Sequence, residues 1–313
     1  MLGHLDRNEA QWIARLFRSL GNISDAQPNP RPNTTKARAS AVPIPMLLSS
    51  LFLHQSGMGM NDQPLSSNSS NPRSRAVVCL SGGMDSAVCA AIAARQHETY
   101  ALHFSYGQRT EQRELASARA IATELQLARF LPLSIDIFRI IGGSALTDTS
   151  IAVPDATPDG PNAGAIGVGI PVTYVPFRNA HFLSAAVSWA EVLGAEAIYI
   201  GAVEQDSSGY PDCRPAYYEA FQELIRTGTR DGSIRIETPL ISMRKHEIVR
   251  RGLELSAPFH VTWSCYTGNQ AACGTCESCI LRLRAFAEAG VDDPIPYATD
   301  WKQTANAPKG ERV

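Results

Sequence analysis

Four cysteines lie within fifteen residues near the carboxyl end of the 313-residue chain. Their spacing, Cys265-x7-Cys273-x2-Cys276-x2-Cys279, supplies four soft thiolate ligands. Thiolates at this density suit tetrahedral Zn²⁺, and a site closed by four sulfurs is structural rather than catalytic. Gly274 permits the tight turn that such a loop needs. The spacing predicts one structural zinc ion, with an iron–sulfur cluster, free thiols or disulfides as alternatives.

A glycine-rich loop, LSGGMDS at residues 80–86, stands between an apolar run and an alanine-rich segment. Glycines let the backbone approach an anion, and the N–H groups at a helix start point at it. The loop matches neither the dinucleotide fingerprint nor the Walker pattern. A carboxylate such as Asp85 would repel phosphate unless a divalent cation lay between them, which indicates Mg²⁺ with a phosphate chain. A plain strand-to-helix turn is the alternative.

Five short apolar runs alternate with helix-prone segments from residue 75 onward. This alternation predicts an α/β fold with a parallel sheet, right-handed crossovers and helices on both faces. Residues 142–173 are rich in Gly, Pro and Asp and predict a long loop. The expected strands are 76–80, 99–104, 129–135, 197–203 and 234–239, and the expected helices are 86–95, 111–125, 182–193, 217–226 and 244–253.

Composition restricts the classes of protein to which the chain can belong. A formal net charge of −2 argues against a general electrostatic grip on nucleic acid. No run of 18 apolar residues and no secretory pattern occur, so we expect a cytoplasmic chain without a membrane span. Cys79 and Cys89 fall in apolar segments and are expected in the core, and Cys213 is interpreted as a small filler residue.

Several motifs in a fixed order resemble those of known enzymes. The glycine-rich loop in its strand–loop–helix setting resembles the pyrophosphate loop (PP-loop) of the ATP pyrophosphatase superfamily, which implies a doubly wound five-stranded parallel sheet of order 3-2-1-4-5. From about Ala76 to about Phe286 the chain resembles the 7-cyano-7-deazaguanine synthase family of queuosine biosynthesis. The segments that carry this resemblance are SYGQR (105–109), TYVPFRN (173–179), GAVE (201–204), SGYPDCR (208–214), TPL (238–240), Lys245, TWSCY (262–266) and the four cysteines.

The resemblance implies an ATP-dependent ligase that forms carbon–nitrogen bonds. The implied reaction converts 7-carboxy-7-deazaguanine and ammonia to the nitrile through adenylated acid and amide intermediates. The implied cofactors are one structural Zn²⁺ per chain and Mg²⁺ with ATP. The implied partners are these small molecules, with neither nucleic acid nor membrane. A homodimer is the assembly that related enzymes commonly form. The implied ATP contacts are Leu80, Ser81, Gly82, Gly83, Met84, Asp85, Ser86, Ala87, Val88, Cys89 and Ala90, with the adenine near residues 103–105.

Further candidates for the site follow the strands. Lys245 comes after the fifth strand, at the carboxyl edge where open α/β sheets bind ligands, and could neutralise the α phosphate or the substrate carboxylate. Arg178 could grip a carboxylate or phosphate. A guanine-like edge offers adjacent N–H donors, which a carboxylate accepts well. The predicted catalytic residues are Asp85, Lys245 and Arg178, and the predicted substrate residues are Asn179, Glu204, Asp206, Tyr210 and Asp212. A solvated helix lysine, a helix cap and a polar surface loop are the alternatives.

The chain divides by composition. Residues 64–72 are rich in Ser, Asn and Pro and cannot bury enough apolar surface to offset chain entropy. We expect a disordered extension at 1–74, an ATP pyrophosphatase-type domain at 75–262, a zinc-binding module at 263–290 and a tail at 291–313. An upstream start, with the working start near Met58 or Met60, is the other interpretation of the extension.

Three other functions are alternatives to this one. A tRNA-modifying thiolase or ligase of the same superfamily would carry paired catalytic cysteines and often a basic surface. The tight cysteine packing and the net charge of −2 disfavour it. A non-catalytic ATP sensor or a zinc-ribbon interaction module would bind ATP without releasing pyrophosphate. An amidotransferase-like synthetase would make its own ammonia, and we expect free ammonia instead because the sequence shows no N-terminal cysteine nucleophile and no glutaminase-sized domain.

Overall fold

The computed structural model describes residues 73–157, 169–204 and 209–299, so the extension predicted at 1–74 lies outside the described residues except for its last two, Arg73 and Ser74. Within them five parallel strands form one sheet in the order β3-β2-β1-β4-β5, which confirms the predicted α/β fold and strand order. The strands are β1 (Arg75–Cys79), β2 (Glu98–Ser105), β3 (Arg129–Ser134), β4 (Ala197–Ile200) and β5 (Arg235–Glu237). The helices are α2 (Met84–Gln96), α3 (Glu111–Glu124), α4 (Ile137–Ile141), α5 (Arg178–Leu193), α6 (Pro215–Gly228), α7 (Lys245–Glu254) and α8 (Glu277–Ala289), with the 3₁₀ turns η2 (Pro211–Cys213) and η3 (Phe259–Val261).

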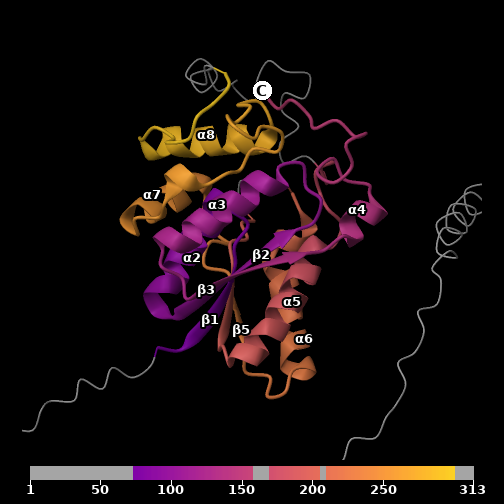
Figure 1. Ribbon diagram of the computed structural model, residues 1–313, viewed down its shortest axis with the longest axis vertical. Helices are drawn as coiled ribbons and strands as arrows, with labels where there is room; N and C mark the ends of the chain where they lie inside the picture. The colour runs from indigo at the N-terminus through magenta and orange to yellow at the C-terminus, as the bar shows by residue number, and fades with distance from the viewer. Residues whose placement is uncertain (1–72, 158–168, 205–208, 300–313) are drawn as a thin grey trace, which may run out of the picture. The chain divides into compact units, whose positions relative to one another are not determined.

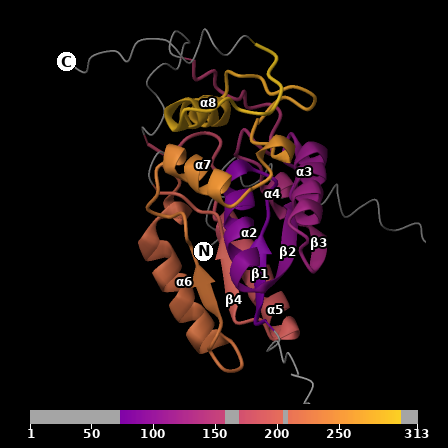
Figure 2. The same ribbon diagram turned by 90° about the vertical axis from the view of Figure 1, so that its left-hand side faces the viewer.

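Each face of the sheet has its own core. Ala76 and Val78 of β1 pack in one core with residues of α2, α3, α7 and α8. Val77 and Cys79 point the other way and pack with residues of α4, α5 and α6. Figures 1 and 2 show α2 and α3 on one side of the sheet and α5 and α6 on the other. Because helices cover both faces, β1 is a continuous apolar run rather than an alternating one.

The observed element ends differ from the predicted ones in informative places. Helix α5 begins at Arg178, four residues before the predicted start, so its first turn carries two of the predicted site residues. Strand β4 ends at Ile200 rather than 203, because its ladder with β1 ends at the pair Cys79–Ile200. Helices α4 and α8 were not predicted. Residues 142–157 and 169–173 contain neither helix nor strand, as expected. None of the described helices is long and apolar enough to cross a membrane.

A buried ion pair ties α8 to the chain that follows it. Arg282 and Asp293 expose 2% and 0% of their side chains, and two hydrogen bonds of 2.7 and 2.9 Å join them. Arg282 also donates to the Thr262 hydroxyl at 2.7 Å, and Tyr297 donates to Asp293 at 2.7 Å. Residues that the sequence assigned to the tail therefore contribute buried partners to α8.

Replacing Arg282 with methionine should lower the free energy of unfolding by about 3–5 kcal/mol, because the fully buried Asp293 carboxylate would lose its ionic partner. Urea denaturation measures this. The control is Arg226→Met on α6, whose 64% exposed side chain pairs with Glu223 at the surface and should cost under about 1 kcal/mol. Equal costs for the two variants would contradict the assignment of Arg282 to a buried pair.

Candidate active site and metal centre

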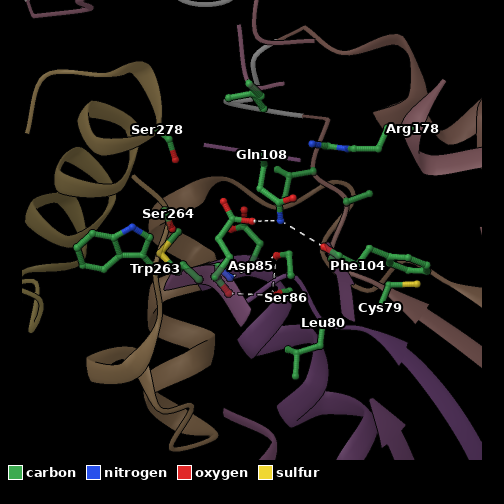
Figure 3. A pocket seen from close by; sticks show the side chains of 18 of the residues that line it. Cys79, Leu80, Asp85, Ser86, Phe104, Gln108, Arg178, Trp263, Ser264 and Ser278 are labelled. Carbon is green, nitrogen blue, oxygen red and sulfur yellow. Dashed lines mark hydrogen bonds between the residues drawn. The ribbon is translucent and has the colours of Figure 1, made fainter. Parts of the chain in front are cut away.

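A cavity of about 290 Å³ opens where β1, β2 and β4 end. This is the carboxyl edge of the sheet, where open α/β folds bind ligands. The glycine-rich loop, the segment after β2, the start of α5 and the segment before the cysteines all line it (Figure 3). Among the predicted residues, the structure brings Asp85, Lys245, Arg178, Asn179 and Tyr210 together around this cavity.

The predicted acidic residues after β4 are placed differently. Glu204 is exposed and does not line the cavity, and Asp206 lies outside the described residues. Asp212 is 3% exposed and also lies off the cavity wall. Its carboxylate accepts the Asn179 backbone N–H at 3.2 Å, and its carbonyl accepts the Asn179 amide at 3.0 Å. Burial raises the pKa of Asp212, and the contacts fasten it to the first turn of α5.

The glycine-rich loop has a conformation that depends on Gly82. Its φ is +94°, and a Cβ there would stand 2.5 Å from the Glu114 carbonyl oxygen. The first intrahelical bond of α2 runs from the Ala87 N–H to Gly83 O at 3.0 Å. The N–H groups of the preceding helical residues therefore have no partner in the helix and can bind an anion. The loop as built is a phosphate cradle closed on one side by α3.

A Gly82→Ala variant should lose about 2–3 kcal/mol of unfolding free energy, because the new Cβ adds a backbone clash to an unfavourable φ. Gly83→Ala is the matched control: its φ is −79°, and the nearest atom to its Cβ is the Ser81 hydroxyl at 3.4 Å. We expect a cost under about 1 kcal/mol for it. Thermal or urea unfolding without nucleotide makes the comparison, and similar costs at both positions would refute the predicted role of the φ at Gly82.

An ion pair lies beside this loop. The Lys245 ammonium at the start of α7 contacts Oδ2 of Asp85 at 2.5 Å, and the two side chains are 16% and 26% exposed. The other carboxylate oxygen, Oδ1, is buried and has no hydrogen-bond partner among the described residues. A carboxylate oxygen left in this way next to a phosphate loop suits a hard divalent cation such as Mg²⁺.

Arg178 approaches the cavity from the opposite wall (Figure 3). Its guanidinium donates to the Tyr106 hydroxyl at 2.9 Å and stacks near the rings of Tyr106 and Phe182, at 5.6 and 5.8 Å. Its Nε is buried and has no hydrogen-bond partner among the described residues. The aromatic rings hold the planar fork in place, and the unpaired donor remains available for an anionic ligand.

Sequence reasoning missed a carboxylate inside the cavity. Glu114 of α3 lines it, accepting from Gln108 Nε2 at 2.9 Å and from the Thr110 hydroxyl at 2.7 Å. Burial raises the pKa of Glu114. The sequence contains one indication of its place. Glu114 follows the SYGQR motif by five residues, and Gln108 of that motif is the residue that donates to it.

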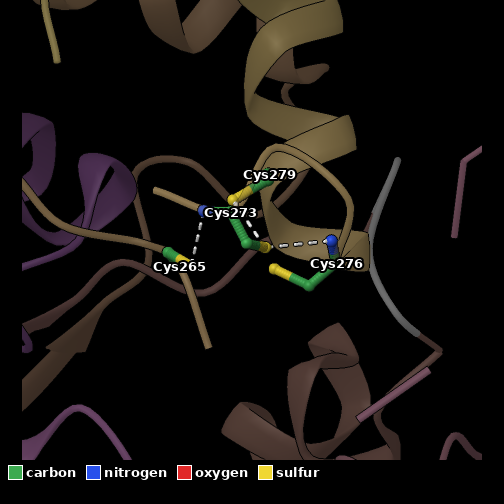
Figure 4. A group of neighbouring side chains, drawn as sticks. All are labelled: Cys265, Cys273, Cys276 and Cys279. Atoms are coloured by element: carbon green, nitrogen blue, oxygen red, sulfur yellow. Dashed lines mark hydrogen bonds between the residues drawn. The ribbon is translucent and has the colours of Figure 1, made fainter. Parts of the chain in front are cut away.

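The four cysteines converge as the spacing predicted (Figure 4). All four sulfur atoms lie within 4.8 Å of one another, and those of Cys273 and Cys279 are 3.8 Å apart. Four thiolates bound at about 2.3 Å to one tetrahedral ion are separated by about 3.8 Å, so the set fits a single metal ion. Backbone N–H groups donate to two of the sulfurs: three to Cys265 and two to Cys273. These donors stabilise thiolate charge, and the predicted metal-binding cluster is confirmed.

The cysteine segment is fastened to the phosphate loop. The backbone N–H of Trp263 donates to the carbonyl of Gly82 at 2.8 Å. The Thr110 hydroxyl, whose proton is shared with Glu114, lies 3.2 Å from the carbonyl of Cys265. The Arg113 guanidinium lies 4.4 Å from the centre of the Trp263 ring. Order at the metal centre therefore contributes directly to the conformation of the loop.

Residues 75–290 match the family described as queuosine biosynthesis protein QueC. The chain belongs to this family. The predicted family is confirmed, and with it the prediction of a PP-loop enzyme of the ATP-dependent ligase class. The roles predicted for the site residues stay predictions, because family membership does not assign them.

Two relatives of this QueC-family chain are named 7-cyano-7-deazaguanine synthase. The protein of Acidobacterium capsulatum is 74% identical over 226 residues, which cover 72% of this chain and 97% of the relative. The protein of Koribacter versatilis is 60% identical over 227 residues, covering 72% and 93%. Among solved structures, the U34-tRNA thiolase NcsA from Methanococcus maripaludis with its [4Fe-4S] cluster covers 63% of this chain and 62% of its own at 10% identity. Its TM-score of 0.37 is too low to support any conclusion about function or metal.

Proposed function

We propose that this protein converts 7-carboxy-7-deazaguanine, ammonia and ATP to 7-cyano-7-deazaguanine. The observation that carries the proposal is the convergence of the phosphate loop with two cationic side chains, Lys245 and Arg178, around one cavity. The names of the relatives supply the substrate class. A carboxylate is a poor electrophile, so an activating group must be attached to it before nitrogen can add.

The first activation uses the two walls of the cavity. Arg178 holds the substrate carboxylate through its unpaired Nε, and one carboxylate oxygen attacks the α phosphorus of ATP. The bond from the α phosphorus to the bridging oxygen breaks, and pyrophosphate leaves into the loop. Lys245 stabilises charge that develops on the α phosphate. The product is the acyl adenylate.

The second half of the reaction repeats this geometry on the amide. Ammonia attacks the acyl carbon, AMP leaves, and loss of a proton gives the amide. The amide oxygen then attacks a second ATP and releases a second pyrophosphate. Loss of AMP and of both N–H protons leaves the carbon–nitrogen triple bond. One loop can serve both steps because an oxygen bound to the same carbon is the nucleophile each time.

The two metals have separate roles in the proposal. Mg²⁺, held by Asp85 and the phosphate chain, would supply charge neutralisation for the departing pyrophosphate. The cysteine ion is Zn²⁺ with a structural role, supported by four sulfurs that leave no position for a substrate. Tyr210 stacks on the base, Asn179 donates to the ligand, and Asp212 positions Asn179.

The nucleotide-binding domain spans 75–262, the zinc module 263–290 and the tail 291–313, and the small molecules are the partners. Figure 1 shows α8, which holds Cys279, beside α7 of the nucleotide-binding part, and Ala285 and Phe286 of α8 share a core with β1.

The test uses the purified chain with ATP, Mg²⁺, ¹⁵N-ammonium and 7-carboxy-7-deazaguanine. Mass spectrometry should detect the labelled amide and then the labelled nitrile, with two AMP and two pyrophosphate formed per nitrile. Bound ATP without pyrophosphate release would instead identify a sensor. Omission of ammonium is the control, and nitrile formed without it would contradict ammonia as the nitrogen source.

A further inference from the structure

Acidic side chains are scarce around the cavity. Among the described residues that line it, only Asp85 and Glu114 are acidic. Asp85 is paired with Lys245, whereas both oxygens of Glu114 accept from neutral groups. Among the described residues, Glu114 is therefore the lining carboxylate that forms no ion pair, and it can accept strong hydrogen bonds from a ligand.

The neighbours of Glu114 hold it in one orientation. Gln108 cannot turn its amide, because its Oε1 accepts the Tyr106 N–H at 2.8 Å while its Nε2 donates to Phe104 O at 3.3 Å (Figure 3). The same Nε2 and the Thr110 hydroxyl each donate to one oxygen of Glu114, at 2.9 and 2.7 Å. Each carboxylate oxygen has about two acceptor sites, so one on each oxygen remains. The carboxylate is thus oriented and retains two acceptors.

Two acceptors side by side match two N–H donors side by side. A guanine-like ring presents this pair at its N1–H and 2-amino group, whereas adenine places a ring-nitrogen acceptor beside its amine and would be repelled. We infer that Glu114 is a specificity-determining residue that binds the N1–H and 2-amino edge of the deazaguanine substrate. This inference rests on the proposed function, and it replaces the acidic residues after β4 as the readers of that edge.

The test compares the substrate with two analogues, one lacking the 2-amino group and one methylated at N1. The wild type should show kcat/KM lower by about 10- to 100-fold for each analogue, because a charged acceptor loses its partner. Glu114→Gln should lower kcat/KM for the true substrate by a similar factor and discriminate among the three compounds by under about 3-fold. KM for ATP should change by under about 2-fold.

Glu114→Gln is a suitable variant because its amide can accept from Gln108 and donate to the Thr110 hydroxyl. The control is Glu111→Gln in the same helix turn, which removes the same charge outside the cavity and should keep the wild-type discrimination. If the role of Glu114 were purely structural, Glu114→Gln would lower stability without changing the ratio of kcat/KM between the substrate and its analogues. Thermal unfolding of both variants separates these effects.

Several outcomes would overturn the inference. If the wild type uses both analogues as well as the true substrate, Glu114 does not bind that edge, and no variant is needed to show it. If Glu114→Gln retains the wild-type discrimination, another residue reads the substrate. If the variant raises KM for ATP but not KM for inosine triphosphate, which lacks the adenine amine, then Glu114 binds the adenine of ATP and another residue reads the substrate. A wild type that forms no nitrile at all would refute the proposed function itself, which is a separate result.

Discussion

Replacing Lys245 with alanine is expected to slow ATP–pyrophosphate exchange by about 100- to 1,000-fold, the largest catalytic effect that we predict. The ammonium contacts Asp85 at 2.5 Å beside the phosphate loop, in a site where both side chains are mostly buried. Its removal takes away a cation that stabilises charge on the α phosphate. It also leaves the Asp85 carboxylate facing the triphosphate, which adds repulsion in the same place.

Exchange of labelled pyrophosphate into ATP, measured with 7-carboxy-7-deazaguanine and without ammonia, isolates the first activation. The control is Arg251→Ala, which removes a positive charge from the same helix at a side chain that is 47% exposed and pairs with Glu254. It should retain exchange within about 2-fold. If Lys245→Ala also retains exchange within that range, Lys245 has no part in the activation.

Replacing Cys279 with serine is expected to abolish metal binding and lower the melting temperature by about 10 °C or more. The Cys279 sulfur is buried and belongs to a set of four within 4.8 Å. Three remaining thiolates bind an ion weakly, and unmatched sulfur charges then repel one another. Because Trp263 holds Gly82, activity should fall as well, even though no cysteine of the cluster lines the cavity.

Metal content measured by inductively coupled plasma mass spectrometry identifies the ion and its ratio to protein. We expect about one zinc per wild-type chain and under about 0.1 in the variant. The control is Cys89→Ala, which is fully buried in the core and should cost about 1 kcal/mol with full metal content. Iron in the wild type would contradict the zinc assignment, and full zinc in Cys279→Ser would contradict that residue as a ligand.

Local patterns were sufficient where neighbouring residues decide the structure. The run Ala76–Cys79 is apolar on both faces and leads into Gly82, so its place as a central strand followed by an anion-binding turn follows from sequence order. The cysteine spacing likewise places four ligands on one short loop and the start of α8. Helix α8 itself was missed, since its buried face contains Arg282, whose partner Asp293 lies eleven residues further along the chain.

The base-reading carboxylate shows the limit of such reasoning. The sequence predicts acidic residues after β4, at the correct edge of the sheet, with Asp212 among the residues that bind the substrate. In the fold its side chain turns into the protein and fastens Asn179, a contact between residues 33 positions apart. Glu114 reaches the cavity instead because α3 starts beside the phosphate loop. The spacing of apolar residues in the sequence predicts only which side of α3 is buried, and not which of its polar side chains face the cavity.

The order of strands and helices, the phosphate loop, the metal ligands and the family are readable in the residues, since each depends on spacing along a short stretch of chain. The pairing of Lys245 with Asp85 across 160 positions, the burial of Asp212 and the entry of Glu114 into the cavity are not. Those depend on how separate elements pack, and many acidic or basic side chains satisfy the same local pattern while only packing selects which of them face the ligand.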